Sequence, residues 1–329
     1  MINGDEMADD QLLADDDDDA AFVFMGGDQE VPRDVRRVRI DESIDTIPEG
    51  LFCMFEELID LEGHDKLKRI EAEAFDGCHS LRRMSNMSCV RQIDENAFFG
   101  CRALSDLEFR KLVIIGCSSF AFCESLRSIN LPSVRRVEGC AFQGCKALTD
   151  AVFGKDLEEI EGSAFHECTA LRRIVIPLKR DLIIYWNAFS ECENLSRVDA
   201  LVGGIHNTIS SLHMKSWRDE LNAEIDRINQ ILPGISASDK TEAIQQWMRS
   251  LFQKIKHYKT EHRVLVKEAM TLLELALWKA NLDDNEAGVP SQEGVRVTRR
   301  QVKRARKERC ITSGAGIIIK NVLPFLELK

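Results

Sequence analysis

The stretch AFFGCRAL, residues 97–104, decides the fold, because its pattern recurs on both sides along the chain. The pattern is A-F-x-x-C-x-x-L, and six copies keep both the phenylalanine and the cysteine, while an earlier copy has Phe55 at the cysteine position. The repeating phenylalanines are 22 to 24 residues apart, at positions 52, 75, 98, 120, 142, 165 and 189. A period of this length predicts a solenoid of stacked units.

The residues on either side of the pattern complete the unit. An apolar pair such as Leu67 and Ile70 precedes each phenylalanine, and a segment such as Leu126-x-x-Ile129-x-Leu131 follows it. Apolar residues that alternate in this way predict a strand with one buried face. Since one unit cannot bury its own apolar stripe, the units must stack along a parallel sheet. We expect eight strands, starting near Val31.

The unit resembles the BspA-like branch of leucine-rich repeats, whose core is followed by an L-x-x-I-x-L-P strand. Leu131-Pro132 and Ile176-Pro177 keep even the proline. The resemblance covers about residues 31–201 and implies an α/β fold class, a leucine-rich-repeat solenoid of seven to eight repeats with a parallel sheet. It also implies a protein-binding surface, and many relatives are cell-surface proteins.

The cellular location expected from the sequence differs from that of those relatives. The first residues have neither a basic region nor an apolar core, so they do not form a secretory signal. No stretch approaches the roughly 20 apolar residues of a membrane helix. The sequence therefore predicts a cytoplasmic or nuclear protein without membrane insertion.

Eleven cysteines raise the question of disulfides or a metal site. Six of them occupy the repeat position that Phe55 fills in the first copy, which indicates an apolar core position. With an odd total and no pair spaced C-x-x-C, buried free thiols are predicted, and neither a metal nor a cofactor is expected. No nucleophile–base pairing or histidine motif is present either, so we expect no catalytic residues and no enzyme.

The ends of the chain carry opposite charges. Residues 1–30 hold eleven acidic residues and no lysine or arginine, which equals the whole net charge of −11. Such a composition cannot bury enough apolar surface to fold, so residues 1–30 are predicted to be a disordered acidic tail. Residues 296–309 hold eight basic residues, which could be a solvated helix, a localisation signal or a nucleic-acid contact, in that order of preference.

From about residue 207 the apolar period becomes helical, which predicts a small all-α region or coiled coil. A first helix ends at Pro233-Gly234, a second begins at Asp239 with a capping box to Glu242, and a third begins after Thr260. The third is apolar nearly all round, which favours a central, buried position. We expect residues 207–282 to form a bundle that caps the last repeat, followed by a linker over 283–294 and a basic helix and tail over 295–329.

The last repeat suggests where that cap would dock. Three residues before the alanine, other copies carry small or acidic residues, whereas the last carries Tyr185 with Trp186 beside it. Aromatic residues at a solenoid end are typical of a buried contact. Tyr185 and Trp186 are therefore predicted to form the interdomain contact.

The concave strand face is the predicted binding surface. Charges alternate in sign along it, and cross-strand ion pairs alone could explain that pattern. Toward the C-terminal half, Val152 and Val175 are expected to form an exposed apolar strip rimmed by charge, which is typical of a protein-binding patch. The predicted partner-binding residues are Asp106, Glu108, Asp150, Val152, Arg173, Val175 and Arg197.

Two functions follow from these features. The first is a non-catalytic scaffold that binds another protein on the concave face. The alternative is a nuclear, nucleic-acid-associated protein that contacts phosphates through residues 296–309, whose binding would weaken steeply between about 50 and 200 mM salt.

Overall fold

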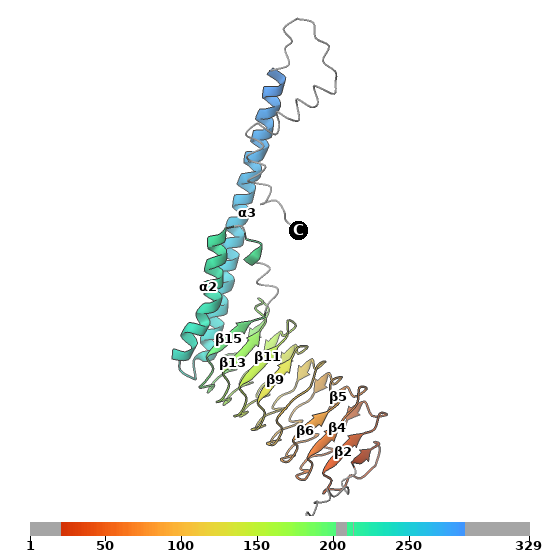
Figure 1. The fold of residues 1–329 in the computed structure, drawn as a ribbon. Coiled ribbons are helices and arrows are strands. Elements are labelled where there is room, and N and C mark those ends of the chain that lie inside the picture. Colours follow the sequence, from red (N-terminus) through yellow and green to blue (C-terminus); the bar gives the residue numbers. More distant parts are fainter. Residues whose placement is uncertain (1–20, 202–208, 213, 287–329) are drawn as a thin grey trace, which may run out of the picture. The chain divides into compact units, whose positions relative to one another are not determined.

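The computed structural model describes residues 21–201, 209–212 and 214–286, with side chains up to residue 279 (Figure 1). The chain divides into two compact units, one consisting of Met1–Val202 with Asp226–Met248 and the other of Gly203–Ile225 with Arg249–Lys329. The solenoid and the first turns of the last helix therefore belong to one unit.

Three parallel sheets form the solenoid. Two four-stranded sheets contain the longer strand of each repeat, in the orders β1-β2-β4-β6 and β15-β13-β11-β9. Their strands are β1 (Phe22–Phe24), β2 (Arg37–Ile40), β4 (Asp60–Glu62), β6 (Arg83–Ser85), β9 (Ser128–Leu131), β11 (Asp150–Phe153), β13 (Arg173–Ile176) and β15 (Arg197–Ala200).

The seven-stranded sheet contains the short strand that precedes each phenylalanine, in the order β14-β12-β10-β8-β7-β5-β3. These strands are β3 (Thr46–Ile47), β5 (Arg69–Ile70), β7 (Gln92–Ile93), β8 (Ile114–Ile115), β10 (Arg136–Val137), β12 (Glu159–Ile160) and β14 (Ile183–Ile184). The predicted solenoid with a parallel sheet is confirmed.

The repeating phenylalanines form one buried column. From Phe52 to Phe189, neighbouring rings are stacked with centroids 5.0 to 5.5 Å apart and planes within 18° of parallel. All seven rings are buried. Because each ring packs on the next, the column joins the repeats into one continuous core.

Each turn around this column relies on left-handed backbone. At Phe98, for example, Asn96 and Gly100 lie two residues before and after the ring, with φ of 54° and 69°. The same two positions have positive φ in each of the first six phenylalanine turns, although glycine occupies only some of them. Besides Asn96, the residues other than glycine at these positions are Met54, Glu73, Ser118, Phe122, Cys140, Ser163 and Glu167.

The two four-stranded sheets, β1-β2-β4-β6 and β15-β13-β11-β9, are separated at residues 105–109. The sequence predicts a strand there, but none forms, although Leu107 and Phe109 are buried as the alternation requires. Asp106 and Glu108 fill the outward positions of this segment, but Asp60 and Glu62 do the same in strand β4, so the acidic residues do not explain the missing strand. The expected continuous row of eight strands is therefore two rows of four.

The N-terminal boundary also differs from the prediction. Residues 1–20 of the predicted acidic tail lie outside the described residues, but residues 21–30 are ordered and include β1. Strand β1 pairs with β2, and Phe24 is buried with its ring 6.0 Å from that of Phe52. The disorder predicted for residues 21–30 and the start near Val31 are wrong, because the apolar triplet Phe22–Phe24 supplies one further strand.

Two described helices follow the solenoid, α2 (Lys215–Ile231) and α3 (Lys240–Glu286), joined through the 3-10 helix η1 (Leu232–Gly234). The predicted second and third helices are one, because residues 255–264 contain neither proline nor glycine. The Thr260 hydroxyl donates to the Lys256 carbonyl inside the helix and so provides no break. The predicted basic helix and most of the predicted linker lie outside the described residues.

Within the second unit, α2 packs beside the middle of α3. The ring of Trp217 stacks on that of Tyr258, and Lys254 forms ion pairs with Glu220 and Glu224. The described part of α2 begins level with Tyr258, so the next turns of α3 have no described helix beside them. The buried position predicted for residues 264–278 is wrong, since the exposed side chains there include Val264, Met270, Leu272, Leu275 and Trp278.

In the first unit, side chains of residues 226–248 complete the hydrogen bonds of the last repeat. In earlier repeats the phenylalanine N–H donates to a carbonyl of the next repeat, as Phe165 does to Ala188. At Phe189 the acceptor is instead the Thr241 hydroxyl, 2.9 Å away. The Lys240 ammonium donates to the carbonyls of Glu193 and Leu195, each at 2.7 Å.

Two further side chains bond to backbone groups of the last strands, one on β14 and one on β15. The Gln245 side-chain amide donates to the carbonyl of Ile184 on β14, at 2.6 Å. The Asn229 side chain accepts from the N–H of Val198 on β15, at 2.7 Å. Side chains thus replace the backbone groups that another repeat would supply, so the open end of the solenoid is satisfied.

Among the described residues, no helix is both long enough and apolar enough to cross a membrane.

Candidate functional site

The outward side chains of the longer strands form a surface that we call the strand face. It comprises the outward residues of β2, β4, β6, β9, β11, β13 and β15, which alternate with buried residues along each strand. Parallel pairing sets these residues in register across neighbouring strands. Each position along a strand therefore becomes a row of side chains at about 4.8 Å spacing.

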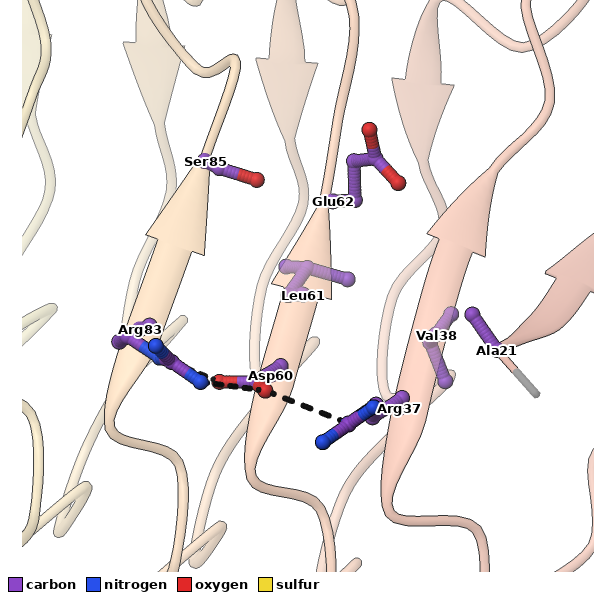
Figure 2. A pocket seen from close by; sticks show the side chains of 8 residues that line it. All are labelled: Ala21, Arg37, Val38, Asp60, Leu61, Glu62, Arg83 and Ser85. Carbon is purple, nitrogen blue, oxygen red and sulfur yellow. Dashed lines mark hydrogen bonds and ion pairs between the residues drawn. The ribbon is translucent and has the colours of Figure 1, made fainter. Parts of the chain in front are cut away.

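The first sheet carries a charged row formed by Arg37, Asp60 and Arg83, which are aligned on β2, β4 and β6. Arg83 donates from Nε and Nη2 to the two carboxylate oxygens of Asp60, at 2.9 and 3.0 Å. Arg37 Nε lies 3.6 Å from the Asp60 carboxylate on its other side. One carboxylate is thus held between two guanidinium groups, as Figure 2 shows.

A second row lies beside the first, formed by Arg39, Glu62 and Ser85. Arg39 Nε donates to Glu62 at 2.9 Å. The first row, together with Glu62 and Ser85 of the second and with Ala21 at the edge, lines an open cavity of about 390 Å³ (Figure 2). Arg37 and Arg83 face Asp60 and Glu62 in this lining, so its charges balance, and Arg39 lies beside the cavity.

The C-terminal sheet carries the row Asp150, Arg173 and Arg197, three of the predicted binding residues. Arg173 and Arg197 both donate from Nε to Asp199, at 2.6 and 2.8 Å. Burial raises the pKa of Asp199, but the hydrogen bonds from the two arginines outweigh it and hold that pKa below its ordinary value. Asp199 therefore stays ionised and fixes both arginines on the strand face.

The apolar strip predicted between these charges is only partly present. Val152 is partly exposed, whereas Val175, which is aligned with it, is only 6% exposed. Asp199 lies opposite Val175 in the register, so the Arg173 side chain that reaches Asp199 runs alongside this valine. The exposure predicted for Val175 is therefore wrong.

The other predicted residues lie apart from this row. Asp106 and Glu108 are exposed, but they belong to the segment without a strand between the two sheets. Tyr185 and Trp186, predicted to form a buried interdomain contact, are 41% and 76% exposed. That expectation is wrong, because the last repeat is covered through polar side chains at its backbone ends and not through these aromatic rings.

The cavity of the first sheet was not predicted from the sequence. Its signal is the segment 33–39, which holds four arginines against one aspartate. The strand pattern at Val38 and Ile40 shows that Arg37 and Arg39 must point outward, but not that Asp60 and Glu62 lie opposite them. Only the register between β2 and β4 brings these residues together.

The six repeated cysteines lie in the core of the solenoid. Each of the six thiols is buried and donates to the carbonyl of the phenylalanine in the preceding repeat, at 3.0 to 3.4 Å. Burial raises the pKa of Cys78, Cys145 and Cys192 to about 12. The prediction of buried free thiols is confirmed, and no cluster of described residues has the composition of a metal site.

Comparison with known proteins supports the same fold. A family model described as "BspA type Leucine rich repeat region" matches in six copies, over residues 33–134 and 91–215. No curated protein matches the chain.

Several solved structures are similar to the solenoid. A T. pallidum leucine-rich repeat protein is 23% identical, with a TM-score of 0.37, over 50% of this chain and 69% of its own. A leucine-rich cell surface protein from Faecalibacterium prausnitzii is 17% identical, with a TM-score of 0.26, over 49% of this chain and 84% of its own. A leucine-rich repeat protein from Bacteroides ovatus is 18% identical, with a TM-score of 0.29, over 48% of this chain and 64% of its own.

Proposed function

Because this chain belongs to the BspA type leucine-rich-repeat family, we propose that it is a non-catalytic scaffold that binds another protein on its strand face. The family match covers more than half of the chain, and repeats of this kind suggest a protein-interaction role.

The observation that carries this proposal is the register of the strand face. Asp150, Arg173 and Arg197 lie side by side on three neighbouring strands, and Asp199 fixes the two arginines. Val152 adds a partly exposed apolar side chain within the same surface. A rigid platform with charged side chains around apolar area suits a protein interface, since little ordering entropy is lost on binding.

The proposal is tested by quantitative capture with the full chain at about 150 mM salt, with nuclease present. Val152→Asp and Asp150→Lys alter outward positions of the strand face, and each should reduce capture of the same partner by roughly tenfold, since each disrupts the interface by about 1.4 kcal/mol. Lys146→Glu, an exposed change outside the strand face, is the matched control. If both variants capture the partner as well as the control does, the binding surface lies elsewhere.

Val175→Asp is not a suitable binding variant, since the side chain is buried. A charge placed there lacks a partner in the core and should lower the stability of the solenoid by several kcal/mol. Loss of binding by this variant would reflect unfolding.

The alternative function, phosphate contact through residues 296–309, concerns a segment outside the described residues. The same capture experiment distinguishes it, because binding through nucleic acid should disappear with nuclease and weaken steeply from about 50 to 200 mM salt. A cytoplasmic or nuclear address stays a prediction from the sequence.

A further inference from the structure

Helix α3 carries an exposed apolar face in the turns that follow Tyr258, where it continues past α2 (Figure 1). Seven large apolar side chains between residues 264 and 278 are exposed, with Leu272 at 60% and Trp278 at 64%. In the same turns Val266 is buried and Leu273 is half-buried, so the helix is covered on one side only. An apolar surface of this kind on a folded unit marks a site of interaction.

Most of these exposed side chains follow a heptad repeat. Leu265 and Leu272 are seven residues apart, and Leu275 follows three residues later, which are the a, a and d positions of a coiled coil. Val264 and Trp278 lie beside this row, each at the position before an a residue. Five of the seven exposed side chains therefore lie along one line of the helix.

We call this row of a and d positions the α3 seam. Its residues are Glu261, Leu265, Glu268, Leu272, Leu275 and Lys279, all of them exposed. The other two exposed apolar side chains, Met270 and Leu277, occupy f positions, which point away from the seam.

The charges of the α3 seam determine which partner fits it. Glu261 is its first residue and Lys279 its last. A second copy aligned in parallel would place each of these charges opposite its own equivalent, which is unfavourable. An antiparallel copy centred on residue 270 instead places Glu261 of each helix opposite Lys279 of the other. The seam is thus complementary in charge to a reversed copy of itself.

The same antiparallel register also matches the apolar side chains. Residues equally far from position 270 face each other, so Leu265 of each helix faces Leu275 of the other, and Val264 lies beside Trp278. The two central layers pair Glu268 with Leu272. There the methylene groups of the glutamate can cover the leucine while its carboxylate stays in water.

We propose that the α3 seam binds a second copy of this chain, as an antiparallel pair of helices over residues 261–279. The seam is about 27 Å long at 1.5 Å per residue, which makes a small interface. Such an interface forms a weak dimer, with a dissociation constant in the range of about 1–100 μM. The contact does not involve the strand face, so it stands or falls separately from the proposed function.

The first test is analytical ultracentrifugation of the full chain at concentrations on either side of the expected dissociation constant. The mass should rise from one chain to two. Leu272→Glu and Leu275→Glu should each weaken dimerisation about tenfold or more, since they bring a charge into the apolar part of the seam. Leu277→Glu is the matched control, because it makes the same change to an exposed leucine outside the seam. Glutamate keeps a high helix propensity, and circular dichroism verifies that every variant is folded.

The second test determines the orientation by exchanging charges. Glu261→Lys and Lys279→Glu should each weaken the dimer about threefold to tenfold, because each turns the two end pairs from attractive into repulsive. The double variant with both changes restores opposite charges at both ends, so its dissociation constant should return close to that of the unchanged chain. In a parallel dimer the single changes would only replace one pair of like charges by another and would have little effect.

A chain that stays monomeric at the highest concentration would overturn the proposal, since another occupant would then cover this face. So would a dimer that Leu277→Glu weakens as much as Leu275→Glu does, because that result describes unspecific apolar association. A dimer that is insensitive to the charge exchanges contradicts the antiparallel seam. Loss with the seam variants together with rescue by the double exchange supports it.

Discussion

The phenylalanine and the cysteine of each repeat stabilise the solenoid in different ways. The ring provides buried apolar area and stacks on its neighbours, whereas the thiol satisfies a carbonyl of the preceding repeat. The sequence predicted that both side chains are buried, since the repeat shows which positions face the core. The hydrogen bond of the thiol was not predicted. The sequence places either cysteine or Phe55 at this repeat position, and it does not show that a phenylalanine carbonyl of the preceding repeat lies beside it.

Removing one ring from the middle of the column should be costly. Phe120→Ala is expected to lower the free energy of unfolding by about 3–5 kcal/mol, since a cavity replaces a ring stacked on both sides. Phe99→Ala removes a partly exposed ring outside the column and should cost less than half as much. Urea denaturation measures both, and equal losses would contradict a special role of the column.

The raised pKa values of the thiols predict a loss of stability in alkali. An unfolded thiol ionises near pH 9, whereas Cys78, Cys145 and Cys192 have folded pKa values of about 12. Below pH 9 both states are protonated, so the stabilisation is fully present. Between pH 9 and 12 only the unfolded state loses protons from these thiols. By pH 10 each thiol therefore lowers the free energy of unfolding by roughly 1 kcal/mol.

Denaturation midpoints across this range measure the effect. Replacing Cys145 by alanine should reduce the alkaline loss, while Cys53→Ala, at a position outside the buried column, should leave more of it in place. A midpoint that stays constant from pH 8 to 11 would contradict the prediction.

The strand face shows where prediction for single residues ends. Alternation correctly placed Val152 and Val175 on one side of their strands, but the exposure of each depends on neighbours such as Arg173 and Asp199. Such neighbours are known only once the register and the rotamers are known. The cavity of the first sheet was missed for the same reason.

At the scale of elements, the end of the solenoid depends on α2 and on the first turns of α3. Lys240 and Thr241 look in the sequence like ordinary polar residues of a helix start. In the structure both are buried, and burial lowers the pKa of Lys240, which nevertheless donates to two carbonyls of the last repeat. No sequence pattern distinguishes a lysine of this kind from a solvated one.

These two side chains should matter far more than their helix position suggests. Lys240→Met leaves two carbonyls without their donor, and Thr241→Val leaves the Phe189 N–H without its acceptor, so each should cost about 1–3 kcal/mol or more. Thr260→Val removes a hydroxyl bonded only within α3 and should cost under about 0.5 kcal/mol. Thermal denaturation of the three variants makes the comparison, and a cost for Thr260→Val matching the other two would contradict it.

The helices also show how much the helical periodicity of apolar residues can predict. Helical periodicity identified the residues of α2 and α3, but it gave no information on whether α3 is interrupted or which of its turns are covered. An apolar turn without a neighbour has the same sequence as one inside a bundle. The exposed residues 264–278 therefore required the structure.

At the scale of the whole molecule, stability is transmitted from repeat to repeat. Each repeat bonds to the next through its backbone and its ring, so local damage should spread according to its position. The sequence predicted this stacking because the period is visible in it. It did not predict the interruption at residues 105–109, where the apolar alternation is intact, or the additional strand β1, which precedes the first copy of the pattern.

Hydrogen exchange can measure how damage spreads. Phe24→Ala alters the terminal repeat and should raise exchange mainly around β1 and β2, since the other repeats keep their neighbours. Phe120→Ala, in contrast, should raise exchange in repeats on both sides of it. Uniform acceleration by Phe24→Ala would indicate that the solenoid opens only as a whole.

The side-chain contacts at the last repeat also bear on how such a chain can change in length. Side chains of residues 226–248 bond to backbone groups of the last repeat, and β1 pairs with the first repeat at the other end. A second copy of residues 120–141 inserted after residue 141 would therefore meet familiar neighbours on both sides and disturb neither terminus. Duplication of an internal unit is thus a route by which the strand face could be lengthened in evolution, or by design, without new solutions for its ends.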